Sequence, residues 1–278
     1  MKNVLLPTDF SDNSKNAIAY ALQFFKNEVC TFYILHVQKA STYTTDDLMA
    51  APANTSIHQS VVGGTKEKLE ILAQQLESEY SEENYTFHTI TDYDIFTDAI
   101  KQVIKTKAID LIVMGTNGAT GAKEVVFGSN TINVIRKVDC PLLAIPEGFS
   151  FTPLQSVLFT IDFSENFTTK GMEPLVHLLE KHKAILRILK IKEDDTVTKA
   201  EFDDKNRMST FFKEINHTFH SIIAVPTSLA INSFVQIMDV DLTAMYIKQD
   251  TFIDRFFKGS KMSKISYGTR VPLLIMHM

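Results

Sequence analysis

The chain carries the same sequence pattern twice, and this duplication limits the folds that it can adopt. Residues 241–278 align without a gap with residues 110–147, and residues 157–164 (VLFTIDFS) repeat residues 4–11 (VLLPTDFS). Matching segments near the start and at the end of both copies indicate two similar structural units in tandem. Any fold proposed for the first half must therefore be repeated in the second.

Each copy alternates short apolar segments with segments of helical spacing. In the first copy we expect strands at 4–6, 29–37, 85–90, 111–114 and 141–145, and helices after Ser11, at 58–80, at 95–104 and from Ser129. Strands that alternate with helices build a parallel sheet with right-handed crossovers. The expected fold is therefore α/β, with two tandem five-stranded parallel-sheet domains at 1–148 and 149–278. Residues 38–57, polar and small, are expected to form a long loop.

The composition excludes several classes of protein. Apolar residues make up 45% of the chain and charged residues 22%, as in soluble globular proteins. The net charge is −5 and no basic stripe occurs, so nucleic acid is not an expected partner. No run approaches the ~18 apolar residues of a membrane helix, and the apolar start is too short for a signal peptide. Cys30 and Cys140 lack C-x-x-C spacing and suit a reducing cytoplasm.

A glycine-rich loop is the most informative local feature. Residues 115–131 read GTNGATGAKEVVFGSNT, follow an apolar run and lead into a helical pattern. Backbone N–H groups of such a loop can approach an anion, and the dipole of the following helix favours negative charge. The spacing, G-x2-G-x9-G-S, differs from those of the P-loop and of G-x-G-x-x-G. We therefore predict a phosphate-binding loop, with a plain strand-to-helix turn as the alternative.

Four motifs together resemble the universal stress protein family. They are a first strand ending in V-x-x-P-T-D-F-S, a fourth strand reading DLIVMG, the G-x2-G-x9-G-S loop and a last strand reading CPLLAIP. The resemblance is close over residues 1–147 and degenerate over 155–278. It implies a Rossmann-like sheet in the order 3-2-1-4-5, with ATP, with or without Mg²⁺, beside the ends of the first and fourth strands. Ligands of open parallel sheets bind where the strand order reverses, which is the same place.

The resemblance also implies roles for particular residues. Pro7, Thr8 and Asp9 would line the adenosine, Val37 would touch the adenine, Gly115 and Gly118 would let the loop close over the phosphates, and the helix start would donate hydrogen bonds. The complete expected nucleotide-binding set is Pro7, Thr8, Asp9, Val37, Met114, Gly115, Gly118, Gly128, Ser129, Asn130 and Thr131. Each has a structural alternative: Asp9 or Ser129 as a helix cap, and Val37 as a core residue.

The sequence contains no assembled reaction site. His217 and His220 form only a lone H-x-x-H on an expected strand, where positions three apart face opposite sides, so they are not expected to share a metal. No G-x-S-x-G elbow occurs. We therefore expect a cytoplasmic, nucleotide-responsive stress protein. The alternatives are an ATP-using enzyme of related architecture, disfavoured because no glycine follows the first strand, and a nucleotide-free protein that binds partners.

The second copy has lost the positions that make the first a candidate site. In the ungapped alignment, Gly115 corresponds to Tyr246 and Gly118 to Gln249, so side chains now stand at both close-approach positions. Ala119 corresponds to Asp250, whose carboxylate would repel a phosphate. We therefore expect one nucleotide site per chain. The alternative is a second pocket for a different, smaller or uncharged ligand, for which Lys248 and Arg255 are available.

The last strand of each copy is apolar and would lie at a sheet edge in the implied topology. Exposed apolar edges tend to pair, and in the family that the chain resembles this strand mediates dimer contacts. We expect the two halves to pair pseudo-symmetrically within one chain, with a homodimer of chains as a further possibility.

Overall fold

The computed structural model describes residues 2–38, 57–116, 127–161, 168–192, 199–247 and 270–277. Residues 39–56 of the expected loop and residues 117–126 of the glycine-rich loop therefore lie outside the described residues. The strands are β1 (Lys2–Pro7), β2 (Cys30–Val37), β3 (Tyr85–Asp92), β4 (Leu111–Gly115), β5 (Leu142–Ile145), β6 (Ser156–Ile161), β7 (Ile185–Lys192), β8 (His217–Ile223), β9 (Leu242–Ile247) and β10 (Leu273–His277). The helices are α1 (Asp12–Phe24), α3 (Ile57–Glu79), α4 (Phe96–Lys107), α5 (Ser129–Lys137), α6 (Thr169–His182), α7 (Lys199–Phe211) and α8 (Thr227–Ile237).

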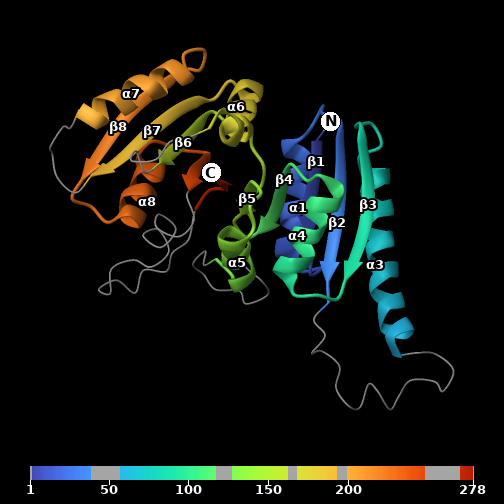
Figure 1. Ribbon diagram of the computed structural model, residues 1–278. Helices are drawn as coiled ribbons and strands as arrows, with labels where there is room; N and C mark the ends of the chain where they lie inside the picture. The colour runs from blue at the N-terminus through green and yellow to red at the C-terminus, as the bar shows by residue number, and fades with distance from the viewer. Residues whose placement is uncertain are drawn as a thin grey trace.

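All ten of these strands join in one sheet, in the order β3-β2-β1-β4-β5-β10-β9-β6-β7-β8 (Figure 1). Within each half the neighbouring strands are parallel, and only the β5–β10 step is antiparallel. The predicted α/β class and the order 3-2-1-4-5 are confirmed for the first half. The second half repeats that order with β8, β7, β6, β9 and β10.

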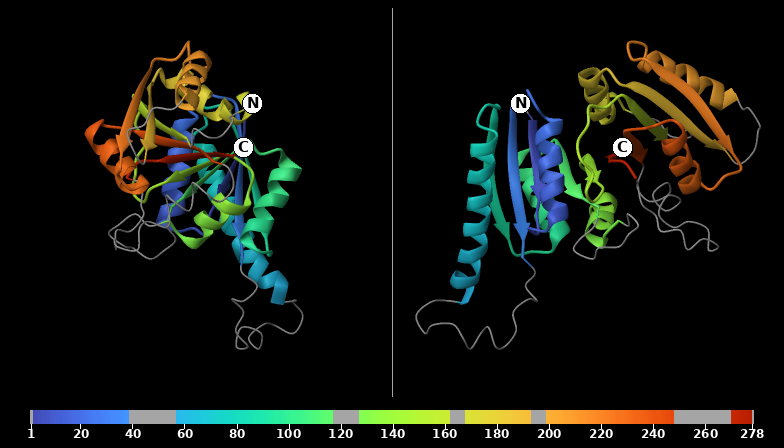
Figure 2. Two further views of the ribbon diagram at one scale, coloured as in Figure 1. Left: turned by 60° about the vertical axis from the view of Figure 1, so that its left-hand side comes forward. Right: turned by 180° about the vertical axis from the view of Figure 1, so that it is seen from behind.

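Helices cover both faces of the sheet, and each face has its own core layer. Helices α1, α3, α6 and α7 contribute to one layer, and α4, α5 and α8 to the other. In the view from behind in Figure 2, α1 and α3 lie in front of the strands. Each layer contains residues of both halves, so the two cores continue from one half into the other.

The continuous apolar runs of the sequence follow from this two-sided burial. In β1, Val4 and Leu6 pack in the layer of α1, and Leu5 packs in the layer of α4 and α5. A parallel strand covered on both faces has no solvent side, so it has no alternating polar positions. No helix of the described part of the chain is long and apolar enough to cross a membrane.

The two halves meet at the antiparallel β5–β10 ladder. Leu143 is in register with Leu274, and Leu142 with Ile275. Leu143 and Leu274 are 0% and 2% exposed and pack in the layer that contains α1 and α6. The connection between the halves turns at Gly148, which has φ of 69°, a left-handed conformation that glycine adopts without strain.

The junction predicts a stability effect. Leu274→Ala should lower the free energy of unfolding by about 2–5 kcal/mol, because it leaves a cavity in a layer shared by both halves. Leu229→Ala is the matched control: Leu229 lies in α8 and is 47% exposed, so its truncation should change stability by less than about 0.5 kcal/mol. Urea titration followed by circular dichroism measures both. Equal effects would contradict a buried junction.

Candidate functional site

The ends of β1 and β4 lie side by side at the point where the strand order reverses. From β1 the sheet continues through β2 and β3 on one side and through β4 and β5 on the other. Val4 is in register with Leu111, and Leu5 with Ile112. The turns that follow these two strands therefore border the same place, which is where ligands of such sheets bind.

The turn between β1 and α1 is built around Thr8. Its N–H donates to the Leu35 carbonyl at 2.8 Å, and its own carbonyl oxygen lies 2.8 Å from Nδ1 of His36. The buried Thr8 hydroxyl accepts from the Phe10 N–H at 3.0 Å and lies 2.9 Å from Oγ of Ser14. These bonds hold Phe10 at φ of 63°, an unusual value for a non-glycine residue. The backbone around Asp9 is therefore held at both ends.

Asp9 presents an ionised carboxylate at the surface of this turn. Its Oδ1 accepts from the Ser11 N–H at 3.0 Å and from the Ser11 hydroxyl at 2.5 Å. Burial raises the pKa of Asp9, but the bonds from Ser11, with a contribution from Ser14, outweigh it and lower the pKa below the ordinary value. Ser11, not Asp9, caps α1, because its Oγ accepts from the Ser14 N–H at 3.2 Å. The capping role offered as the alternative for Asp9 therefore belongs to Ser11.

The other side of the site is the join between β4 and α5. The Thr131 hydroxyl donates to the Gly115 carbonyl at 3.0 Å and lies 3.3 Å from the Thr116 carbonyl. The Gly128 N–H also donates to the Thr116 carbonyl. Thr131 is 2% exposed, so these bonds lie in a dry environment. They close the two ends of the glycine-rich loop onto each other and point the start of α5 at the end of β4.

The start of α5 has no side-chain hydrogen bond at its N-cap. Its N-cap is Gly128, which offers no side-chain hydrogen bond, and its first turn contains no acidic residue. The alternative role of Ser129 as the N-cap is therefore wrong, because the N-cap is the residue before it. Ser129 and Asn130 are exposed. The first N–H groups of a helix have no intrahelical partner and attract anions. The start of α1, by contrast, is capped by Ser11 and carries Asp12.

The structure explains the glycine at position 115 by a contact that the sequence did not reveal. A Cβ at this position would lie 2.5 Å from Nδ2 and 2.8 Å from Oδ1 of Asn13. Asn13, in the first turn of α1, is 5% exposed and packs directly against the end of β4. Glycine is required here by this contact, whether or not a ligand approaches. Asn13 precedes Ala17 by four residues, so its place on the apolar stripe of α1 was the available signal.

The remaining predicted residues are distributed around the same edge. Pro7 and Met114 are buried, and Val37 is half-buried at the end of β2. Met114 and Val37 both contribute to the core layer of α4 and α5, so packing accounts for both without a ligand. Gly118 lies outside the described residues, and its role stays a prediction.

In the second half, a tyrosine fills the place that corresponds to Gly115. Tyr246 is fully buried, and its hydroxyl lies 3.2 Å from the Thr168 nitrogen and 3.3 Å from Thr168 Oγ1. Thr168 is the N-cap of α6. The ring packs so closely that a Cβ on Gly171 would lie 2.5 Å from the tyrosine oxygen. The start of the first helix of this half is therefore occupied by the protein's own side chain.

The described residues contain no cluster of side chains suited to hold a metal ion. No three His, Cys, Asp or Glu side chains among them come together. The two histidines of the H-x-x-H pair have separate partners: Nδ1 of His217 contacts the Ile215 carbonyl, and Nε2 of His220 contacts the Thr218 hydroxyl. Burial, together with nearby carboxylates, raises the pKa of Cys30 and of Cys140 to about 12. Such thiols are poor nucleophiles.

Comparison with known proteins places the chain in a family. The model of the universal stress protein family matches residues 1–146. The chain is 26% identical over 156 residues to universal stress protein MJ0577 of Methanocaldococcus jannaschii, covering 52% of this chain and 94% of that protein. It is 29% identical over 147 residues to universal stress protein YxiE of Bacillus subtilis, covering 51% and 97%. These relatives correspond in length to one half of the chain.

One solved structure matches the fold over almost the whole chain. It is the crystal structure of a universal stress protein from Archaeoglobus fulgidus, with a TM-score of 0.74 and 18% identity, covering 98% of this chain and 97% of that one. A mostly parallel sheet in this order, covered by helices on both faces, defines a protein of the open, doubly wound α/β type. The chain belongs to the universal stress protein family.

The contact between Gly115 and Asn13 predicts a compensating pair of substitutions. Gly115→Ala should lower stability by about 1–3 kcal/mol, because the new methyl group overlaps the Asn13 amide. In an Asn13→Ala background the same substitution should cost less, since the amide is gone. Gly64→Ala is the control: no atom lies within 4 Å of its Cβ, and in a helix alanine should stabilise by roughly 0.5–1 kcal/mol. Additive costs in the double variant would contradict the contact.

Proposed function

We propose that the N-terminal half binds ATP, with or without Mg²⁺, and that the chain is a cytoplasmic, nucleotide-responsive stress protein. The observation that carries the proposal is the start of α5. It lacks a side-chain cap and an acidic first turn, and Thr131 holds it at the end of β4, where ligands of such sheets bind. Its N–H groups and the exposed Ser129 and Asn130 side chains are suited to receive phosphates.

The nucleoside would lie on the β1 and β2 side of the same edge. Asp9 is a fixed, ionised acceptor there, and ribose hydroxyls are donors that match it. Val37 offers an apolar surface at the end of the next strand, which suits the adenine ring that the family resemblance assigns to it. Pro7, Thr8 and Met114 would shape the floor between these groups.

We infer that each chain holds one nucleotide, in the first half. The buried Tyr246 ring stands where Gly115 stands in the first half, and its hydroxyl bonds to the cap of α6. A ligand at the end of β9, the counterpart of β4, would therefore have to displace a bonded and fully buried side chain. The units 1–148 and 149–278 would thus share a fold but differ in function.

Calorimetric titration of the full chain with ATP should give a stoichiometry near one. Asp9→Ala and Gly118→Leu should each weaken binding about tenfold or more, by removing an acceptor of charge-assisted hydrogen bonds and by filling the phosphate space. Asp12→Ala is the matched control, because this fully exposed carboxylate lies three residues from Asp9 and makes only a surface ion pair. Two nucleotides per chain, or parent-like affinity in both folded site variants, would contradict the proposal.

We further propose that the β5–β10 ladder holds the two halves together in solution. Because these edges are occupied by each other, a homodimer of chains would have to use another surface. Small-angle scattering at several protein concentrations should then report a single compact particle with the dimensions of one continuous ten-stranded sheet. Two particles joined by a flexible connection would contradict the pairing.

A further inference from the structure

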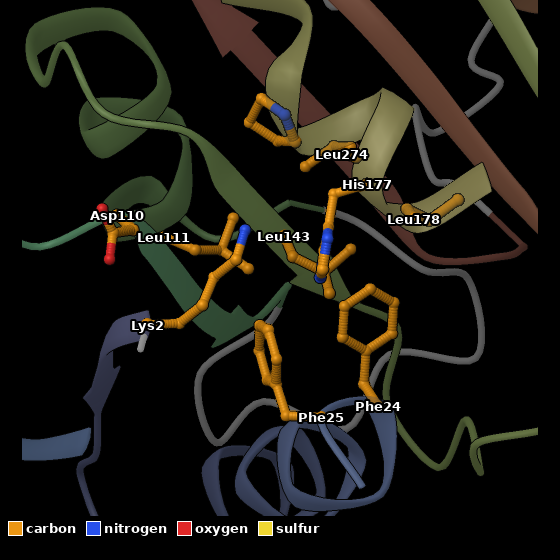
Figure 3. A pocket seen from close by; sticks show the side chains of 10 residues that line it. Lys2, Phe24, Phe25, Asp110, Leu111, Leu143, His177, Leu178 and Leu274 are labelled. Atoms are coloured by element: carbon orange, nitrogen blue, oxygen red, sulfur yellow. The ribbon is translucent and has the colours of Figure 1, made fainter. Parts of the chain in front are cut away.

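The second half contacts the C-terminal end of α1 through helix α6. A cavity of about 30 Å³ lies between them, lined by residues that include Phe24, Phe25, His177 and Leu178. Figure 3 shows His177 of α6 pointing toward Phe24, the last residue of α1, with the C-cap residue Phe25 beside it. The volume is about that of one water molecule, so the contact is an interface rather than a ligand site.

An ion cluster lies at the centre of this contact. Nζ of Lys181 donates to the carbonyl oxygens of Phe24 at 2.6 Å and Lys26 at 3.2 Å, and to Oε1 of Glu28 at 2.5 Å. Nε2 of His177 lies 3.0 Å from Oε2 of the same carboxylate. Lys181 of one half therefore satisfies carbonyls at the end of a helix in the other, a place that favours a cation.

Glu28 is held ionised by this arrangement. Burial raises the pKa of Glu28, but the hydrogen bond and charge of Lys181, followed by the contribution of His177, outweigh it and lower the pKa. The Lys181 and Glu28 side chains are only 21% and 18% exposed, so the pair is less screened by solvent than a surface ion pair.

His182, the last residue of α6, lies next to the cluster in an aromatic environment. Its ring centroid is 5.8 Å from that of Phe24 and 5.9 Å from that of Phe151, which belongs to the connection between the halves. Its Nε2 is buried and has no hydrogen-bond partner among the residues that the structure describes. A neutral imidazole fits this place, whereas a protonated one would bring a buried, unpaired N–H close to Lys181.

We propose that the contact between α6 and the end of α1 is an acid-sensitive clasp between the two halves, in which Glu28 and Lys181 hold it closed and protonation of His182 opens it. The proposal is independent of nucleotide binding. The charged and titratable groups around His182 are Lys181 and His177 on α6 and Glu28 beyond α1, with Lys2 and Asp110 lining the adjoining cavity.

The direction of the effect follows from the surroundings of His182. Burial lowers the pKa of His182 below the ordinary value of 6.5, Lys181 lowers it further, and the opposing contribution of Glu28 is smaller than these two. The open or unfolded chain therefore binds the proton more readily than the closed one. The contribution of His182 to stability is complete above pH 6.5 and is lost as the pH falls toward its lowered value. Aromatic faces offset part of this loss.

The absence of tryptophan from the chain provides a clean test. A Phe151→Trp variant reports on the clasp by its fluorescence. From pH ~8 to ~5 its emission should move to longer wavelength as the interface opens, while the far-ultraviolet circular dichroism stays unchanged. Adding His182→Phe, which keeps an aromatic ring but cannot titrate, should abolish the shift. A Phe149→Trp variant is the positional control. Phe149 lies in the same connection as Phe151, and its ring packs near that of Tyr20 in α1.

A second measurement needs no tryptophan. The slope of unfolding free energy against pH gives the number of protons taken up on unfolding. Below pH 6.5, this number should be smaller in His182→Phe than in the parent, by up to about one proton. His88→Gln, on the distant strand β3, should leave that number unchanged. Glu28→Gln should loosen the clasp at neutral pH, seen as a lower midpoint of thermal unfolding. An equal emission shift with and without His182, no shift in either, or an unchanged proton number would overturn the proposal.

Discussion

Burial of the central strands on both faces is the constraint on which the rest of the structure depends. Strands β4, β5 and β9 are buried along nearly their whole length. Such strands need helices on both sides, and parallel neighbours need crossovers that return the chain to the same end of the sheet. The crossovers place the loop after β1 and the loop after β4 at the same edge of the sheet, where the parallel strands end. The candidate site is a consequence of how the core is covered.

Much of the fold, and the strand ends at which the candidate site lies, could be predicted from sequence, because both depend on local patterns. Apolar runs and helical spacing marked the elements, and the duplication indicated that they occur twice. The contacts around the candidate site and between the halves could not be predicted, since they join residues far apart in the chain. Asn13 meets Gly115 about a hundred residues later, and Lys181 meets Glu28 across the two halves. Ser11 and Asp9 were both plausible caps, and only the hydrogen bonds assign the role to Ser11.

The two halves share one fold but differ at corresponding residues near the ends of β4 and β9. Where the first half has Gly115, the side chain of Asn13 packs against bare backbone, and the start of α5 is left without a side-chain cap. Where the second half has Tyr246, the ring packs against α6 and bonds to its cap. The tyrosine thus ties the end of β9 to the start of α6, the counterpart of α1, and adds buried apolar area.

The β5–β10 ladder lies within one polypeptide, and this has a consequence for its behaviour on dilution. Two separate subunits joined by such an edge dissociate as their concentration falls, and their stability depends on mass action. Here the effective concentration of one edge at the other is set by the short connection through Gly148. The proposed pairing in solution, with the contact between α1 and α6 that accompanies it, should therefore not depend on how many copies of the protein a cell holds.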